Sequence, residues 1–255
     1  MDNLYNPFSL EGKTILVTGA SSGIGRQCAI DCSRMGAKVV AIARNTERLD
    51  ETLSYLHGEG HRSYSFDLSN CEDIKDIVSL IVEENGKLDG LVYAAGIEKS
   101  MPAKLLKTSD YEEVMRINTY GAFEIARHVT GVKSFNSKGS IVFISSITSI
   151  IARKSTAAYS ASKGALVSGA RVLAAELANR KIRVNCISPG TILTPLMQNY
   201  LSGLSDENYK KRVDGFPLGL GESSDISYAC VYLLSDASRW ITGQNLIIDG
   251  GYTIN

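Results

Sequence analysis

A tyrosine and a lysine four positions apart are the residues of this 255-residue chain most suited to chemistry. Tyr159 and Lys163 belong to Tyr-Ser-Ala-Ser-Lys, and on a helix this spacing places both side chains on one face. A nearby ammonium favours the phenolate, so we expect Lys163 to lower the pKa of Tyr159 from its ordinary value near ~10. A decrease of about three pKa units, roughly 4 kcal/mol, would make Tyr159 a usable acid and base near neutral pH.

A serine ends the apolar, β-rich run that precedes the tyrosine. The run Gly-Ser-Ile-Val-Phe-Ile-Ser-Ser spans residues 139–146. Ser146 is therefore expected at the carboxyl edge of a strand, where open α/β sheets bind ligands and where its hydroxyl could hydrogen-bond a carbonyl oxygen. The alternative is that Ser146 merely ends a strand and that the Tyr-x-x-x-Lys spacing arises by chance.

A second motif lies near the N-terminus. Residues 13–17 read Lys-Thr-Ile-Leu-Val, a strand pattern, and residues 18–25 follow as Thr-Gly-Ala-Ser-Ser-Gly-Ile-Gly before the helical run 26–35. Glycines let backbone N–H groups approach a pyrophosphate, which the positive end of the helix dipole also favours. The segment predicts a dinucleotide-binding loop, although its spacing differs from the common Gly-x-Gly-x-x-Gly.

The elements that would position these residues alternate along the chain. Helical patterns separate strands expected near residues 13–18, 37–43, 62–66, 88–93, 139–145, 181–187 and 244–249. This alternation predicts an α/β fold of the Rossmann type, a doubly wound and predominantly parallel sheet with helices on both faces. No repeat or linker divides residues 1–255, so we expect a single dinucleotide-binding and catalytic domain.

Charge and composition exclude several partners. Lys plus Arg and Asp plus Glu both number 27, so no global field favours nucleic acid or a membrane surface. The first twelve residues lack the basic start and apolar core of a signal peptide, and no later segment offers ~20 uninterrupted apolar residues, so we expect a cytoplasmic protein. The five cysteines form no Cys-x-x-Cys pair and are interpreted as packing residues, so no metal site is predicted.

In their order along the chain, these motifs resemble those of the short-chain dehydrogenase/reductases, over nearly the whole sequence. Asn118, in Ile-Asn-Thr-Tyr-Gly, matches the family's catalytic asparagine, which helps to hold a water linked to the lysine. The resemblance therefore implies a seven-stranded sheet and a catalytic tetrad. The tetrad comprises Asn118, Ser146, Tyr159 and Lys163.

The resemblance also implies residues that surround a nicotinamide dinucleotide. Asp67 and Leu68 match the step that contacts adenine, residues 188–194 match the segment that lines nicotinamide, and Lys163 is implied to bond the nicotinamide ribose. The implied cofactor-binding residues are Gly19, Ser21, Ser22, Gly23, Ile24, Gly25, Arg44, Asp67, Leu68, Ala94, Ala95, Gly96, Tyr159, Lys163, Pro189, Gly190, Ile192 and Thr194. The chain departs from the family at Tyr93, where asparagine is frequent, and we expect this tyrosine to alter support of the sheet rather than chemistry.

Residues that end the second predicted strand indicate which dinucleotide is preferred. A carboxylate there binds the ribose 2′-hydroxyl of NAD, whereas arginine attracts the 2′-phosphate of NADP. Ala43 supplies no carboxylate and Arg44 supplies a guanidinium, so NADP(H) is favoured over NAD(H). Against this, Ser22 stands where some NADP-using relatives have a basic residue, and Arg44 could be a solvated residue paired with Glu47 or Asp50.

Together these features predict hydride transfer between nicotinamide and a carbonyl or secondary alcohol, with Ser146 orienting the oxygen and Tyr159 supplying its proton. The C-terminal run 240–251 resembles 3-oxoacyl-carrier-protein reductases and sugar or polyol dehydrogenases alike. We expect an NADP(H)-dependent ketoreductase of the 3-oxoacyl-carrier-protein type, acting on a small carbonyl or alcohol that is free or carried on acyl carrier protein. The alternatives are an NAD-dependent sugar or alcohol dehydrogenase and, in another class, a nonenzymatic dinucleotide-binding sensor or scaffold.

Three further expectations concern the substrate and assembly. Residues 195–217 mix aromatic and charged side chains and are expected to form a substrate lid, the alternative being a helical pair that closes the core. Lys138, Arg180 and Lys181 could form a basic patch for an acidic carrier protein. The resemblance implies a homotetramer, and the small residues along 159–178 would permit close helix contact between copies.

Overall fold

The computed structural model describes residues 5–254, whose strands form one seven-stranded sheet. Residues 1–4, which belong to the segment 1–12 that lacks the features of a signal peptide, lie outside the described residues. The strands are Thr14–Thr18 (β1), Lys38–Ala43 (β2), Arg62–Ser65 (β3), Leu88–Tyr93 (β4), Phe135–Ile144 (β5), Arg183–Pro189 (β6) and Asn245–Ile248 (β7). They pair in the order β3-β2-β1-β4-β5-β6-β7, and every neighbouring pair is parallel. The predicted fold class is confirmed.

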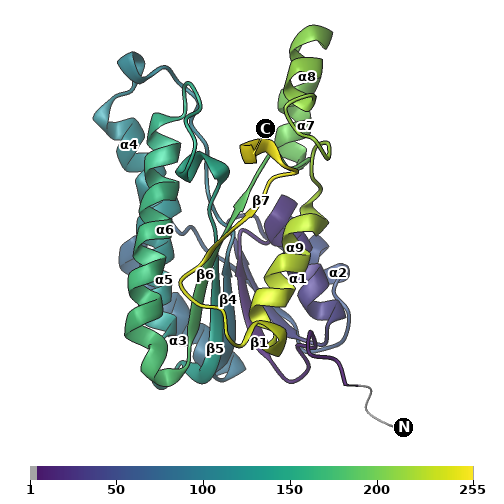
Figure 1. Ribbon diagram of the computed structural model, residues 1–255. Helices are drawn as coiled ribbons and strands as arrows, with labels where there is room; N and C mark the ends of the chain where they lie inside the picture. The colour runs from purple at the N-terminus through teal and green to yellow at the C-terminus, as the bar shows by residue number, and fades with distance from the viewer. Residues whose placement is uncertain (1–4, 255) are drawn as a thin grey trace.

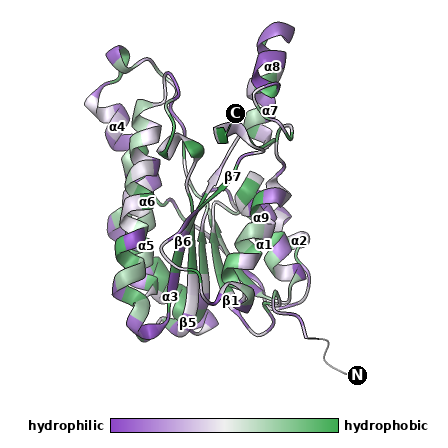
Figure 2. Cartoon of the chain, viewed as in Figure 1, coloured by the Kyte–Doolittle hydropathy of each residue, from purple (hydrophilic) through white to green (hydrophobic). Residues whose placement is uncertain are grey.

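Helices cover both faces of this sheet. They are Gly23–Arg34 (α1), Thr46–Ser54 (α2), Ile74–Asn85 (α3), Thr108–Met115 (α4), Gly121–Val129 (α5), Ala157–Leu177 (α6) and Ser223–Leu234 (α9). α3, α5 and α6 lie on one face, and α1, α2 and α9 on the other (Figure 1). Side chains along β1 alternate between the two faces, Leu16 packing on the first and Ile15 and Val17 on the second. The strands and the inner helix faces carry most of the hydrophobic residues (Figure 2).

The fifth strand begins earlier than its apolar pattern indicates. We expected it near residue 139, but it starts at Phe135, which is buried and pairs with Leu88. Asn136 holds this added part by donating from Nδ2 to Oδ1 of Asp89 at 2.8 Å. Polar residues at 136–138 interrupt the apolar pattern, so the pairing, which is stabilised by burial of Phe135 and by the contact of Asn136, is not evident from hydrophobicity.

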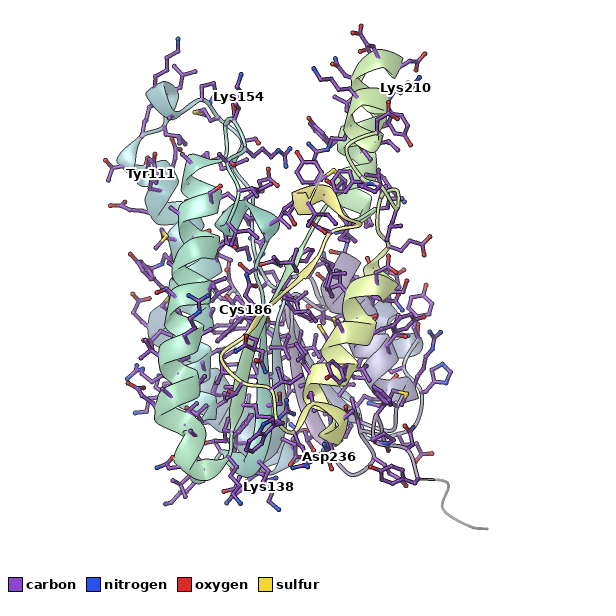
Figure 3. All side chains as sticks on the ribbon, in the orientation of Figure 1. Tyr111, Lys138, Lys154, Cys186, Lys210 and Asp236 are labelled. Carbon is purple, nitrogen blue, oxygen red and sulfur yellow. The ribbon has the colours of Figure 1, made fainter. Side chains whose placement is uncertain are left out.

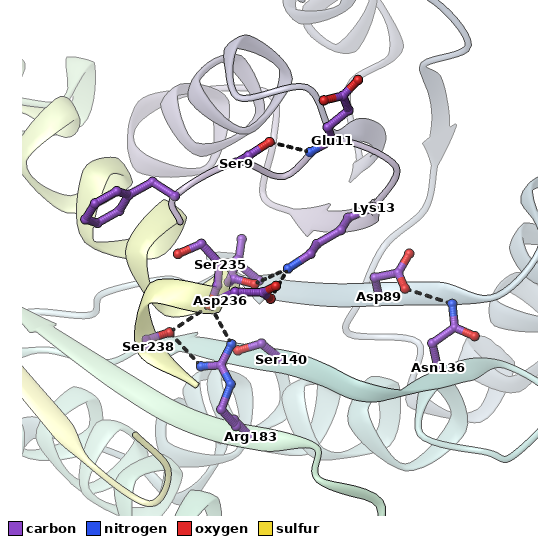
Figure 4. Close-up of polar contacts among 12 residues, drawn as sticks. Ser9, Glu11, Lys13, Asp89, Asn136, Ser140, Arg183, Ser235, Asp236 and Ser238 are labelled. Atoms are coloured by element: carbon purple, nitrogen blue, oxygen red, sulfur yellow. Dashed lines mark hydrogen bonds and ion pairs between the residues drawn. The ribbon is translucent and has the colours of Figure 1, made fainter. Parts of the chain in front are cut away.

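Polar contacts close the amino ends of the strands (Figure 4). Arg183 donates to the carbonyl oxygen of Leu233 at 2.6 Å and to Oγ of Ser238 at 2.8 Å. Lys13 and Asp236 form an ion pair with 2.8 Å between Nζ and Oδ1. These contacts hold the end of α9 against β1 and β6 and stabilise this end of the molecule.

Two further helices extend beyond the opposite, carboxyl ends of the strands. They are Pro195–Ser202 (α7) and Asp206–Val213 (α8), each begun by a side-chain cap. Figure 1 shows them standing above the sheet, and α8 is mainly hydrophilic in Figure 2. α7 buries Leu201, whereas α8 has no buried residue, so α8 adds nothing to the core. Of the helices within residues 5–254, none is both long and apolar enough to cross a membrane.

Candidate active site

Two adjoining cavities lie at the carboxyl ends of the strands. One of about 380 Å³ adjoins the glycine loop, and one of about 640 Å³ extends toward α7 and α8. Both are lined by Ile24, Ala94, Gly96, Ile97, Thr194 and Leu196. The six shared residues place the two cavities side by side.

The glycine loop is held against the end of β4. Oγ1 of Thr18 accepts hydrogen bonds from the backbone N–H groups of Ala94 and Ala95, at 3.1 and 3.2 Å. Gly19 has a positive φ of 66°, and a Cβ added there would lie 2.8 Å from the nitrogen of Ala95. Only glycine fits this position, because a side chain would be both strained and too close to the backbone. The smaller cavity thus has the close-packed, side-chain-free wall that a dinucleotide phosphate requires.

The residues implied to bind the cofactor divide between the two cavities. The smaller cavity is lined by Gly19, Ser21, Ser22, Gly23, Ile24, Gly25, Arg44, Asp67, Leu68, Ala94, Ala95, Gly96 and Thr194. The larger is lined by Tyr159, Lys163, Pro189, Gly190 and Ile192, together with the shared residues. The structure therefore brings the whole set together around two adjoining cavities.

Two arginines face the outer part of the smaller cavity. Nη1 of Arg44 lies 3.8 Å from Oδ2 of Asp67, and 66% of the Arg44 side chain is exposed. Asp67, rather than Glu47 or Asp50, is thus its ion-pair partner. Arg48 lines the same cavity from the first turn of α2. No motif indicated Arg48. Its spacing of four positions from Arg44 could have done so.

Asn118 is fully buried in a π-helical turn at Arg116–Tyr120 and lines neither cavity. Its Nδ2 donates to the carbonyl of Ile97 at 2.9 Å and to Oγ of Ser162 at 3.0 Å, and its Oδ1 accepts from the N–H of Ile97 at 2.8 Å. A Cβ added to Gly96 would lie 3.1 Å from Oδ1 of Asn118 and 3.4 Å from Nζ of Lys163. Asn118 therefore lies directly behind the cavity wall and fixes it against α6.

Ser146 and Tyr159 both line the larger cavity. Ser146 follows β5 as expected, and its Oγ accepts from the N–H and the hydroxyl of Thr148 at 3.2 and 3.1 Å. Burial raises the pKa of Tyr159 to about 12, Glu98 adds to the increase, and a hydrogen bond with Ser146 opposes it. The expected lowering by Lys163 is absent from the structure. Burial removes water from the phenolate, and this cost exceeds the favourable contacts.

Lys163 is buried beneath the same wall, with its side chain directed at the backbone of β5. Nζ donates to the carbonyl oxygen of Ile144 at 2.8 Å. Burial lowers the pKa of Lys163 to about 8, because the ammonium has lost most of its hydration. Tyr93, the departure from the family pattern, is also buried, and its hydroxyl donates to the carbonyl of Ile117 at 2.6 Å. This contact agrees with the supporting role expected for it.

The proposed basic patch for a carrier protein lies at the wrong end of the sheet. Lys138 is near the start of β5, and Arg180 and Lys181 precede the start of β6, whereas both cavities open at the strands' carboxyl ends. Figure 3 shows Lys138 at the opposite end of the molecule from Lys154 and Lys210. Arg180 is also engaged, donating to the carbonyl of Phe135 at 2.6 Å. The predicted strands near residues 139–145 and 181–187 already placed these charges at the amino ends of the strands.

The larger cavity contains charged residues that no motif indicated. They are Glu98, Arg153, Lys211 and Arg212. Within residues 5–254, no group of three or more His, Cys, Asp or Glu side chains is arranged to hold a metal ion.

Comparison with known proteins agrees with this geometry. The model of the family described as enoyl-(acyl carrier protein) reductase matches residues 19–253. Glucose 1-dehydrogenase of Gluconobacter oxydans (strain 621H) is 38% identical over 248 residues, 95% of this chain and 92% of that protein. The 3-oxoacyl-[acyl-carrier-protein] reductase of Thermotoga maritima is 33% identical over 248 residues, 96% of this chain and 99% of that protein.

Solved structures show the same relationship. A candidate 2-deoxy-D-gluconate 3-dehydrogenase from Agrobacterium tumefaciens, with bound NADP, has a TM-score of 0.88 at 31% identity, covering 98% of this chain and 100% of that one. Fold and relatives define an α/β oxidoreductase that acts on alcohol or carbonyl groups with a nicotinamide dinucleotide. The chain belongs to the short-chain dehydrogenase/reductase family.

Proposed function

We propose that the protein is an NADP(H)-preferring enzyme that interconverts a secondary alcohol and a carbonyl in a small polar molecule. The observation that carries this proposal is that Ser146 and Tyr159 line a cavity that adjoins the glycine-loop cavity and shares six lining residues with it. Catalysis is assigned to Asn118, Ser146, Tyr159 and Lys163. The remaining residues of the two walls hold the cofactor, which when bound supplies or accepts the hydride.

In this proposal Tyr159 holds the proton that is exchanged with the substrate oxygen. With a pKa of about 12, its hydroxyl is protonated at neutral pH and can donate to a carbonyl oxygen during reduction. Ser146, fixed by Thr148, orients that oxygen. Lys163 lies behind the phenol, with Nζ 5.7 Å from the centre of its ring, and is proposed to bond the nicotinamide ribose of the cofactor.

NADP(H) is the proposed cofactor because of the groups around the outer part of the smaller cavity. Ala43 supplies no carboxylate to repel a 2′-phosphate, while Arg44 and Arg48 both supply guanidinium groups. Asp67 lies beside Arg44 and is the one acid that lines this cavity among residues 5–254, so the balance of charge favours an anion. The NADP in the related Agrobacterium tumefaciens structure supports the same preference.

The substrate candidates follow from the relatives. Glucose 1-dehydrogenase favours a sugar or polyol, and the charged residues in the larger cavity suit a polar substrate. A 3-oxoacyl thioester on acyl carrier protein is the second candidate, supported by the Thermotoga maritima reductase. We also propose that residues 195–217 form a lid over the substrate, because α8 packs no residue into the core.

Location and assembly are further parts of the proposal. The five free cysteines suit the reducing cytoplasm. A homotetramer is proposed in which the outer face of α6 meets a second copy, since Ala161, Val172 and Ala175 are exposed there and a Cβ at Gly164 would meet nothing within 4 Å. Ala170 and Ala174, by contrast, pack against the protein's own sheet.

A screen of cofactor oxidation tests this function. The purified protein is mixed with NADPH or NADH and with sugars, ketoacyl thioesters, quinones and small ketones, and absorbance of the reduced cofactor is followed. We expect turnover of a polar carbonyl, faster with NADPH than with NADH. Tight dinucleotide binding without turnover of any compound would instead support a nonenzymatic sensor or scaffold.

A further inference from the structure

The larger cavity carries an unbalanced positive charge beside the proposed catalytic residues. Apart from Lys163, its charged lining residues are Arg153, Lys211 and Arg212 against the single acid Glu98. Lys211 is exposed at the rim, whereas Arg153 and Arg212 are partly buried. Partial burial of two guanidinium groups costs free energy of desolvation, and an anionic ligand offsets this cost better than a neutral sugar or an acyl chain does.

Arg212 extends from the α8 helix into this cavity. Its Nη2 donates to Oγ1 of Thr191 at 2.9 Å, which anchors one side of the guanidinium to the segment after β6. Its Nε is buried and has no hydrogen-bond partner within the described residues. A buried N–H without a partner is costly, so this group is suited to an acceptor that a ligand brings.

Arg153 approaches the same space from the loop that leads to α6. Its one ion-pair contact within the described residues is long, 3.8 Å from Nη1 to Oε1 of Glu98. Arg153 and Arg212 line the same cavity as Tyr159. Burial lowers the pKa of Arg212 and raises that of Tyr159, and the charge of Arg153 adds to the first change and opposes the second.

We propose that Arg153 and Arg212 form a subsite for the carboxylate of the substrate, which is then a small hydroxy acid or oxo acid. This inference rests on the proposed alcohol–carbonyl chemistry at Ser146 and Tyr159. Arg153 and Arg212 outnumber Glu98, and the N–H fork of a guanidinium matches the two oxygens of a carboxylate. A cavity of about 640 Å³ also has the size of a small-molecule site.

The subsite couples the substrate to the lid. Arg212 belongs to α8, whereas Arg153 belongs to the main body, so one carboxylate would bridge the two. An acidic substrate would thereby hold α8 over the reacting carbon, and a neutral analogue of the same length would not.

Binding of matched neutral and acidic ligands tests the subsite without requiring turnover. Protein saturated with NADPH, which cannot react with an alcohol, is titrated calorimetrically with D-gluconate, D-glucitol and D-glucitol 6-phosphate. We expect gluconate to bind at least about tenfold more tightly than glucitol, as is typical when a charge-assisted pair is formed. Equal affinity of gluconate and glucitol, or tighter binding of the phosphate, would overturn the carboxylate assignment.

Variants identify the residues responsible. Arg153→Met and Arg212→Met should each remove most of the preference for gluconate, and Arg212→Lys should restore only part of it. Lys210→Met is the matched control, because it removes a positive charge from α8 outside the cavity lining. Retained NADPH affinity shows that each variant is folded. A preference unchanged in both arginine variants, or lost equally in the control, would overturn the proposal.

A parallel turnover assay separates this inference from the proposed function. If a neutral alcohol is oxidised faster than every hydroxy acid, the function stands and the subsite is overturned. If no compound reacts but gluconate binding depends on both arginines, the anion subsite stands and the proposed reaction fails.

Discussion

Nζ of Lys163 donates a hydrogen bond to the carbonyl oxygen of Ile144 at 2.8 Å, at the point where β5 ends. The same Nζ lies 5.7 Å from the centre of the Tyr159 ring. The ammonium is thus anchored to the sheet and lies close to the phenol. Burial nevertheless raises the pKa of Tyr159 to about 12, and Glu98 adds to the increase.

The buried lysine makes stability depend on pH. Its pKa is lowered from 10.5 to about 8, so between these values the unfolded chain binds more protons and stability rises with pH. Below pH 8 the cost of burying the charged ammonium, about 3 kcal/mol, destabilises the folded state in full. Lys163→Met should therefore gain free energy of unfolding relative to the parent protein at pH 7, and lose about 2 kcal/mol of that gain by pH 9.5.

Urea unfolding of both cofactor-free proteins at the two pH values measures this difference. All other titratable groups are present in both proteins, so their contributions cancel in the difference between the two free energies of unfolding. Loss of the hydrogen bond to Ile144 shifts the stability difference between the two proteins by the same amount at pH 7 and at pH 9.5. The change of that difference between the two pH values is therefore the quantity to compare. A difference that stays constant with pH would show that Lys163 keeps an ordinary pKa in the folded protein.

Cofactor preference should change with two residues. Ala43→Asp combined with Arg44→Ser replaces attraction of a 2′-phosphate with a carboxylate that repels it and bonds the ribose hydroxyl. We expect the ratio of kcat/KM for NADPH over NADH to fall at least about tenfold, as for loss of one charge-assisted contact. The single variant Arg48→Ser measures how much the second arginine contributes to the preference for NADPH. An unaltered ratio in the double variant would place discrimination elsewhere.

Assembly should depend on the outer face of α6. Val172 is 55% exposed in the single chain, and Val172→Glu would put a charge into the proposed contact between copies. Light scattering at micromolar concentration should give a tetramer for the parent protein and a smaller species for the variant. Val132→Glu, at a position 71% exposed beyond α5, is the control. A monomeric parent protein would contradict the proposed assembly.

Much of this architecture can be predicted from the sequence, because buried parallel strands leave continuous apolar runs. The glycine loop could be placed as well, since Gly19 is required by the approach of Ala95. The early start of β5 could not be, because Asn136 holds it through a polar contact with Asp89. Spacing along the chain indicates which groups are near one another, but it does not measure their burial.

The same limit applies to the site. Tyr-x-x-x-Lys correctly placed Tyr159 and Lys163 near one another, but the direction of the tyrosine's pKa depends on how much water reaches it. Arg153 and Arg212 belong to no motif and come from distant segments, so only the folded chain brings them to one cavity. Substrate selection is accordingly the part of the function that sequence predicted least.

Replacement of one hydroxyl tests the central claim most directly. Tyr159→Phe removes the proposed proton donor and little contact area, so turnover should fall by at least about a hundredfold, the usual contribution of general acid catalysis. NADPH affinity, followed by fluorescence titration of the same preparation, should change less than about threefold. Loss of turnover with retained NADPH binding is the predicted result. Turnover close to that of the parent protein would contradict the assignment of Tyr159 and the mechanism built on it.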